Sequence, residues 1–213
     1  MSNFIEQLKS MEDINNLIQQ IIDNPENIKV LIDTVKNEKR AIKYNCEKVL
    51  RLASETCPEL IYPYFDAFVT LMDIDNKFLK WGALLIIANL TAVDVNDKFA
   101  SNFDKYFSLI TGSEMVSANN IIGSSVKIAD NKPELIDRIV NEILKVDKAT
   151  YIHKGEVSPE CKNVAYGEAI KAFDKLYDKA QNKQDILAFV RRQIGNTRAK
   201  VSKSAQIFIK KYS

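Results

Sequence analysis

The sequence predicts an all-α protein in which pairs of helices repeat along the chain. The 213 residues include only 6 glycines and 5 prolines, which is little turn-forming capacity for a protein of many strands. One sequence pattern recurs five times. The stretch from Asp75 to Ala92 is apolar on nearly every side when it is drawn as a helix, so neighbouring helices must cover it all round.

The recurring pattern is an aliphatic residue, a base, and a small residue three positions after the base, with apolar positions four and seven residues further on. Within residues 75–92 these are Leu79, Lys80, Ala83, Ile87 and Leu90. The small residue of each copy is Cys46, Ala83, Ala118, Ala165 or Val201. The intervals are 37, 35, 47 and 36 residues, a period typical of stacked helix pairs.

A first helix is expected before each of these second helices, often opened by a proline such as Pro25, Pro58 or Pro133. Residues 1–23 are expected to form an N-terminal cap of two short helices, and residues 24–213 the five repeats of a single domain, 1–213. The long third interval places an inserted loop near residues 147–158, which contains the only histidine, His153.

The pattern resembles HEAT repeats, in which a proline-initiated first helix is followed by a second helix with a base three positions before a small residue. The resemblance covers roughly residues 24–212, and armadillo repeats are the nearest alternative. The third copy departs from it, because Met115 stands in the position of the base. The resemblance implies a right-handed α-α superhelix, a HEAT-like solenoid of about five helix pairs whose second helices line the concave side.

A binding surface is expected on that concave side, along positions spaced by four residues on each second helix. It would be apolar in the middle and polar at its ends, suited to a peptide or a partner helix. The expected surface residues are Glu47, Arg51, Leu84, Met115, Asn119, Tyr166 and Ile170. The alternative is that the helical phase is displaced by one residue and that these side chains belong to the core.

The bases of the pattern are Lys43, Lys80, Lys162 and Arg198. They would either form a basic ladder toward a ligand or tie the two helices of a pair together by contacting a turn Asp or a carbonyl. The second interpretation needs no ligand.

The C-terminal region is basic, with seven bases and no acid from Ile186 to Ser213. Five of these bases form a candidate patch for nucleic-acid phosphates: Arg191, Arg192, Arg198, Lys200 and Lys203. No aromatic residue is interleaved with them for base stacking, so the alternative is a solvated helix face.

Other classes of protein have little support in the sequence. The longest uncharged apolar run is far shorter than a membrane helix, and no signal peptide is recognised, so we expect no membrane association. Three widely spaced cysteines are typical of a reducing compartment, which predicts a cytoplasmic location. His153 fits no zinc spacing, and no phosphate-binding loop is present, so no catalytic residue, metal or cofactor is predicted.

The sequence therefore predicts a non-enzymatic scaffold that binds a protein or peptide along the concave face of a helical-repeat solenoid. The alternative is a nucleic-acid-binding protein related to the HEAT-like DNA glycosylases, using the basic C-terminal repeat. That resemblance would imply a groove with aromatic and basic residues around a catalytic Asp, and no Asp lies on the expected surface. Self-association through the apolar strip is a third hypothesis.

Overall fold

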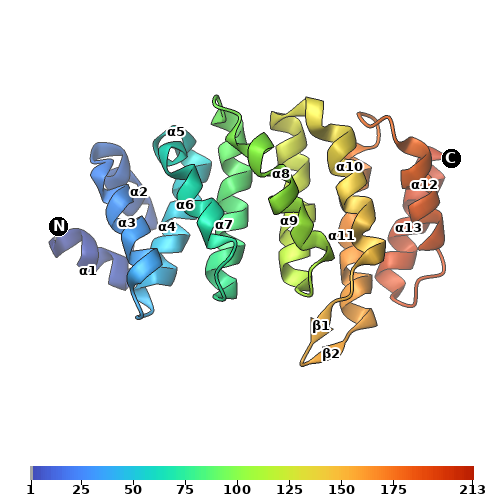
Figure 1. Cartoon of the computed structure of the whole chain (residues 1–213), viewed down its shortest axis with the longest axis horizontal. Coiled ribbons are helices and arrows are strands. Elements are labelled where there is room, and N and C mark those ends of the chain that lie inside the picture. The colour runs from blue at the N-terminus through green and yellow to red at the C-terminus, as the bar shows by residue number, and fades with distance from the viewer. Residues whose placement is uncertain (1) are drawn as a thin grey trace. The chain divides into compact units, whose positions relative to one another are not determined.

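A computed structural model describes residues 2–213, with side chains from Phe4 onward, and most of these residues are helical (Figure 1). The all-α prediction is therefore confirmed. The chain forms two compact units, of which unit 1 ends at Asn102 and unit 2 begins at Phe103. The expectation that residues 1–213 form one domain stays a prediction.

Unit 1 consists of two N-terminal helices followed by successive helix pairs. Its elements are α1 Ser2–Ser10, α2 Ile14–Asp23, α3 Glu26–Asn37, α4 Ile42–Thr56, α5 Pro58–Ile61, η1 Tyr62–Tyr64, α6 Phe65–Leu71, α7 Lys77–Leu90 and η2 Thr91–Val93. Helix α8, Lys98–Ser108, begins in unit 1 and ends in unit 2. Helix α4 packs against both α3 and α7, and α6 packs against α7, so the predicted pairing of first and second helices is present.

Buried polar contacts fix the neighbours of α7 in unit 1. The amide of Asn89 in α7 donates a hydrogen bond of 2.8 Å to the hydroxyl of Ser54 in α4. The buried carboxylate of Asp94 accepts from the Tyr62 hydroxyl at 2.6 Å and from the backbone amide of Lys98 at 2.8 Å. Asp94 thus caps the start of α8 and ties it to the segment after α5.

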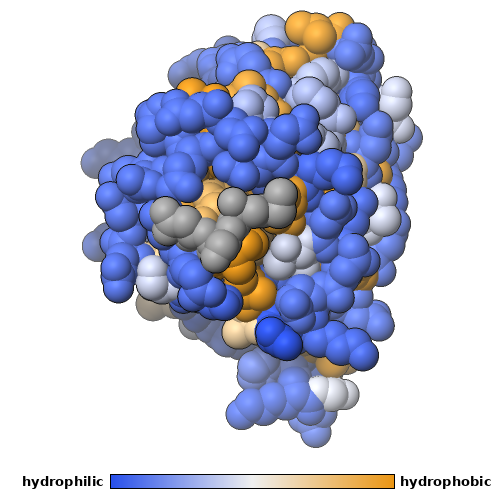
Figure 2. Space-filling view, turned by 90° about the vertical axis from the view of Figure 1, so that its left-hand side faces the viewer, coloured by the Kyte–Doolittle hydropathy of each residue, from blue (hydrophilic) through white to orange (hydrophobic). Residues whose placement is uncertain are grey.

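The N-terminal cap predicted for residues 1–23 forms the two helices α1 and α2, while Met1 lies outside the described residues. Asp13 caps α2, since its side chain accepts a hydrogen bond of 3.0 Å from the backbone amide of Asn16. Figure 2 looks onto this end of unit 1, whose visible surface is largely hydrophilic with a narrow hydrophobic strip near its middle. A hydrophilic outer face is what a terminal repeat needs.

Unit 2 continues the helix pairs and contains the one hairpin found in residues 2–213. Its elements are η3 Leu109–Thr111, α9 Met115–Asn131, η4 Pro133–Leu135, α10 Ile136–Leu144, η5 Lys145–Lys148, β1 Ile152–His153, β2 Glu156–Val157, α11 Pro159–Leu176, α12 Lys183–Arg192 and α13 Ala199–Tyr212. The second helices α9, α11 and α13 pack in that order, with α10 against α11 and α12 against α13. The small residues predicted to anchor the repeats are all at most 2% exposed: Cys46, Ala83, Ala118, Ala165 and Val201.

The insertion predicted as a loop near 147–158 forms a short antiparallel hairpin, in which Ile152 pairs with Val157 and His153 with Glu156. Lys154 and Gly155 have φ values of 53° and 85°, which gives the two consecutive positive φ angles of a tight hairpin turn. Both strands are exposed, and Figure 1 shows them projecting away from the helices of unit 2.

None of the three cysteines forms a disulfide bond. Cys46 is buried, whereas Cys57 and Cys161 are half-buried, and all three are free. Burial raises the pKa of Cys46 to about 11, so its thiol stays protonated at neutral pH. No helix within residues 2–213 has both the length and the apolar character that a bilayer crossing requires.

Candidate functional site

The start of α7 is fixed against α4 by one asparagine of unit 1. Asn76 caps α7 by accepting a hydrogen bond of 3.3 Å from the backbone amide of Leu79. Its side-chain amide also donates to the Tyr44 hydroxyl on α4 at 3.0 Å. The capping residue therefore sets both where α7 begins and which side chain of α4 lies beside it.

Three aromatic side chains meet at this point, and we call Tyr44, Phe78 and Trp81 the aromatic cluster. Phe78 lies edge-to-face with Tyr44 at 6.1 Å between ring centroids and with Trp81 at 5.2 Å. Phe78 is 66% exposed and Tyr44 is 38% exposed, whereas Trp81 is half-buried. Exposed rings gathered on one face are typical of an interaction site rather than of a solvated surface.

The next turn of α4 brings a carboxylate onto the backbone of α7. Glu47 accepts a hydrogen bond of 3.2 Å from Nε of Arg51, and its side chain is only 15% exposed. A Cβ built on Gly82 of α7 would lie 2.1 Å from Oε1 of Glu47, so any larger residue at this position would require the Glu47 side chain to move. Burial raises the pKa of Glu47, and the charge of Arg51 opposes that shift. Both predicted surface residues, Glu47 and Arg51, are thus engaged with each other and only partly accessible.

The prediction that Leu84 and Ile170 form an exposed apolar strip is wrong, because they are 0% and 2% exposed. The exposed positions of α7 are displaced by one residue from the expected column: Trp81 and Leu85 are half-exposed while Leu84 lies in the core. Because α7 is apolar all round, its sequence does not reveal its phase.

Tyr166 is also directed away from the expected surface. Its ring lies edge-to-face on Phe189 of α12 at 5.7 Å, and Asp147 of η5 contacts its hydroxyl. Burial and the carboxylate of Asp147 raise the pKa of Tyr166 to about 12. Lys162, one of the bases of the repeat pattern, donates a hydrogen bond of 2.7 Å to the backbone carbonyl of Asp147. At Lys162, this contact agrees with the interpretation that the bases of the pattern tie the two helices of a pair together.

Met115 and Asn119 are half-buried at the start of α9 and contact each other. The side-chain amide of Asn119 lies 3.0 Å from the sulfur of Met115. The Oδ1 atom of Asn119 is buried and has no hydrogen-bond partner among the described residues. Neither side chain is a freely exposed docking residue.

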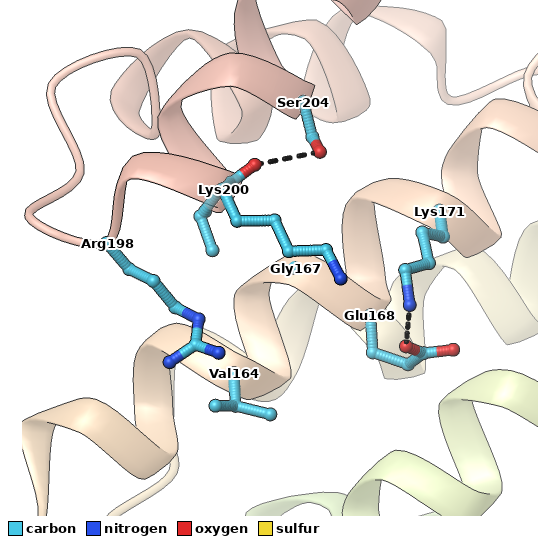
Figure 3. A pocket seen from close by; sticks show the side chains of 8 residues that line it. Val164, Gly167, Glu168, Lys171, Arg198, Lys200 and Ser204 are labelled. Carbon is cyan, nitrogen blue, oxygen red and sulfur yellow. Dashed lines mark hydrogen bonds and ion pairs between the residues drawn. The ribbon is translucent and has the colours of Figure 1, made fainter.

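Unit 2 has open hollows on both sides of α11, and we call the two between α11 and α13 the basic groove. Figure 3 shows the first of these two hollows. The first hollow has a volume of about 80 Å³ and is lined by Gly167, Glu168, Lys171, Arg198, Lys200 and Ser204, among others. The second hollow has a volume of about 290 Å³ and is lined by Ile170, Asp174, Ile207, Phe208 and Lys211, and it shares Lys171 and Ser204 with the first. A further hollow of about 290 Å³ lies between α9 and α11, beside Gly123 and Lys175.

The structure separates the predicted basic patch rather than gathering it. Arg198 and Lys200 line the basic groove together, and Lys203 is exposed on α13 outside its lining. Arg192 forms an ion pair with Asp147. Arg191 donates to the side chain of Ser213 at 3.4 Å, beyond the end of α13 opposite to Arg198.

The single histidine of the sequence, His153, lies in unit 2. His153 is exposed at the hairpin, where it pairs with Glu156. Across residues 2–213, no three histidine, cysteine or acidic side chains are grouped closely enough to hold a metal ion.

Sequence reasoning did not single out Tyr44, Phe78 or Trp81, because the stretch from Asp75 to Ala92 was expected to be covered by neighbouring helices all round. A signal was present, since Phe78, Trp81 and Leu85 recur at helical spacing on one face of α7. Lys171 and Ile207 of the basic groove had no comparable signal, because only the packing of α11 against α13 makes them neighbours.

Solved structures share this fold at low sequence identity. A designed armadillo repeat protein in complex with the peptide (KR)4 matches with a TM-score of 0.61 and 15% identity, over 98% of this chain and 92% of that chain. A second designed armadillo repeat protein matches with a TM-score of 0.58 and 15% identity, over 100% of this chain and 92% of that chain. An engineered protein matches with a TM-score of 0.57 and 16% identity, over 99% of this chain and 96% of that chain.

No protein-family model and no curated protein matches the chain. The structural matches show the fold alone, which is an armadillo- or HEAT-like helical repeat. The resemblance inferred from the repeat pattern is therefore confirmed at the level of architecture, and function has to be argued from the site.

Proposed function

We propose that the chain is a non-enzymatic scaffold that binds a protein or peptide partner, with the aromatic cluster of unit 1 as its anchor. The observation that carries the proposal is Phe78, which is 66% exposed although it belongs to the most apolar helix of the unit. Tyr44 and Trp81 hold its ring in place by edge contacts. Rigid aromatic side chains that keep apolar surface in water are the usual energetic centres of protein interfaces.

The mechanism is burial of apolar side chains of the partner on Phe78 and Trp81. The Tyr44 hydroxyl, held by Asn76 at 3.0 Å, keeps the rim of the cluster polar. Lys43 lies 5.4 Å from the centre of the Tyr44 ring and adds positive charge at the same edge. One of the similar structures holds a peptide, which supports a peptide or protein as the kind of partner.

The nucleic-acid alternative has weaker support. Two of the five bases that it requires, Arg192 and Arg198, already form ion pairs with Asp147 and Glu160. Exposed aromatic rings, which would stack on bases, lie in unit 1 at the aromatic cluster and not among the C-terminal bases. Self-association and a cytoplasmic location stay predictions.

A displayed library of random peptides, selected on the wild-type chain, tests the proposal. Peptides that bind the wild type should lose binding to Phe78→Asp, which places a charge in the centre of the cluster. The matched control is Val95→Asp, because Val95 is 84% exposed in unit 1 and lies outside the cluster. Failure to enrich any peptide, or equal binding to both variants, would contradict the proposal.

A further inference from the structure

The basic groove of unit 2 is a second candidate peptide site, independent of the aromatic cluster. Its two hollows adjoin between α11 and α13, since Lys171 and Ser204 line both of them. Gly167 lies on the α11 side of the first hollow and presents no side chain there (Figure 3). The two hollows therefore form one continuous depression with distinct ends.

The first hollow carries an uncompensated positive charge. Arg198 is paired with Glu160, and Lys171 with Glu168 at 2.7 Å. Lys200 forms no ion pair with any of the residues that the structure describes, and its side chain extends from α13 toward α11 (Figure 3). A carboxylate entering this hollow would meet an available ammonium group next to a guanidinium.

The second hollow is apolar in its floor and on one wall. Ile170 and Phe208 are each 2% exposed, and Ile207 is 60% exposed. The charges of Lys211 and Asp174 at the rim of the second hollow offset each other, because the two side chains form an ion pair of 2.9 Å. This hollow fits an aliphatic side chain, which would cover the exposed surface of Ile207.

The distance between the two hollows limits the spacing of the groups that they accept. The residues that line the second hollow come about four positions later along α11, and about seven positions later along α13, than those that line the first. At the rise of an α-helix, the two hollows are therefore about 6–10 Å apart. In an extended chain, side chains two residues apart point to the same side and lie about 7 Å apart. An extended peptide can therefore place two such side chains into both hollows at once.

We propose that the basic groove binds an extended acidic peptide segment, with an Asp or Glu beside Lys200 and Arg198 and an aliphatic residue two positions away on Ile207. The inference deepens the proposed function, on which it rests for the premise that the chain takes peptides. Charge complementarity selects this occupant. Of the four bases of the lining, Lys171, Arg198 and Lys211 pair with Glu168, Glu160 and Asp174, and Lys200 is left without an acidic partner among the described residues.

The test uses fluorescein-labelled peptides that differ in one property each, measured by fluorescence polarisation. The probe is Ser-Glu-Ser-Leu-Ser with blocked ends. Ser-Gln-Ser-Leu-Ser removes the charge, Ser-Lys-Ser-Leu-Ser reverses it, and Ser-Glu-Leu-Ser-Ser turns the aliphatic residue to the other side. The variants are Lys200→Glu in the groove, Lys203→Glu as an exposed control on the same helix, and Ile207→Ser in the second hollow.

The probe should bind more tightly than the three altered peptides and more weakly as salt is raised. Lys200→Glu should weaken its binding about tenfold or more, the loss expected when a charge-assisted contact is removed, and Lys203→Glu far less. Ile207→Ser should weaken the probe but not Ser-Glu-Leu-Ser-Ser. All three substituted positions are at the surface, and circular dichroism checks that the variants stay folded.

Equal binding of the Gln or Lys peptide would overturn the inference, as would equal losses from Lys200→Glu and Lys203→Glu. The proposed function fails separately. If library peptides bind through Phe78 while the probe does not bind, the scaffold proposal stands and the groove inference falls. If the probe binds through Lys200 while Phe78→Asp has no effect on any peptide, the groove inference stands and the aromatic cluster is not the anchor of the scaffold.

Discussion

The two compact units present different surfaces although they share one repeat pattern. In unit 1 the second helices α4 and α7 approach closely, because Gly82 accepts the Glu47 side chain on its backbone, and their surface carries exposed aromatic rings. In unit 2 hollows open between α11 and α13, and their walls carry lysines and an exposed isoleucine. The pattern dictates which residues are buried and leaves the exposed positions free to differ. Each unit is therefore expected to select its own kind of side chain.

Substitution of two helical glycines should affect stability with opposite signs. Gly82→Ala should destabilise the protein by about 1–3 kcal/mol, because a Cβ would meet the Glu47 side chain and force it away from Arg51. Gly123→Ala should stabilise it by up to ~1 kcal/mol, since alanine is the better helix former. At Gly123 the new Cβ would lie 3.4 Å from Oε1 of Glu168, which is an ordinary van der Waals contact. Urea unfolding measures both changes.

The double variant Gly82→Ala with Glu47→Ala tests whether the clash with the Glu47 side chain causes the loss of stability. Removal of the Glu47 side chain should recover most of the stability lost in Gly82→Ala. If the double variant is as unstable as Gly82→Ala, the close approach of Glu47 to α7 is not the cause.

Duplex DNA should bind weakly, with a Kd of about 10⁻⁴ M or weaker at physiological salt, as for non-specific contacts. Neutralisation of Arg191, Arg192, Arg198, Lys200 and Lys203 should change this retention little, because two of these bases already contact carboxylates. Salt-dependent elution from immobilised DNA checks the expectation. Tight retention that is lost in the neutralised variant would restore the nucleic-acid alternative. It would also contradict the expectation that unit 2 binds a peptide through its basic groove.

The smallest expected effect is the pH dependence of Glu47. Its pKa is raised above 4.5 by burial, so the folded state keeps its proton to higher pH than the unfolded state does. The contribution of this group to the unfolding free energy should therefore be greatest at low pH and should fall as pH rises from about 4.5 through the folded pKa. Unfolding of the wild type and of Glu47→Gln, compared between pH 4 and pH 7, measures it. A difference that stays constant with pH would contradict the assigned shift.

The buried part of the fold was predictable from sequence. Periodicity located the five anchor residues, and Pro25, Pro58 and Pro133 marked the starts of α3, α5 and η4, because a proline is tolerated only at the beginning of a helix. The exposed surface was not predictable in the same way. In α7, an error of one residue in the helical phase predicts that Leu84 is exposed instead of Leu85. The sequence cannot reveal this error, because the helix is apolar on nearly every side.

The contacts of polar side chains also required the structure. Tyr166 matched the expected surface by spacing, yet the carboxylate of Asp147 and the ring of Phe189 hold it on the other side of α11. The hairpin at residues 152–157 depends on the positive φ of Lys154 as well as of Gly155, and a lysine gives little indication of that conformation.

The fluorescence of Trp81 reports whether a peptide binds at the aromatic cluster, because Trp81 is the only tryptophan in the chain and belongs to that cluster. A peptide selected on the wild type is titrated against the wild type, Phe78→Asp and Val95→Asp. We expect a saturable change in tryptophan emission for the wild type and Val95→Asp, with binding to Phe78→Asp weakened by about 2 kcal/mol or more, as for an interface anchor. A peptide that binds the wild type and Phe78→Asp equally, with no change in Trp81 emission, would contradict it.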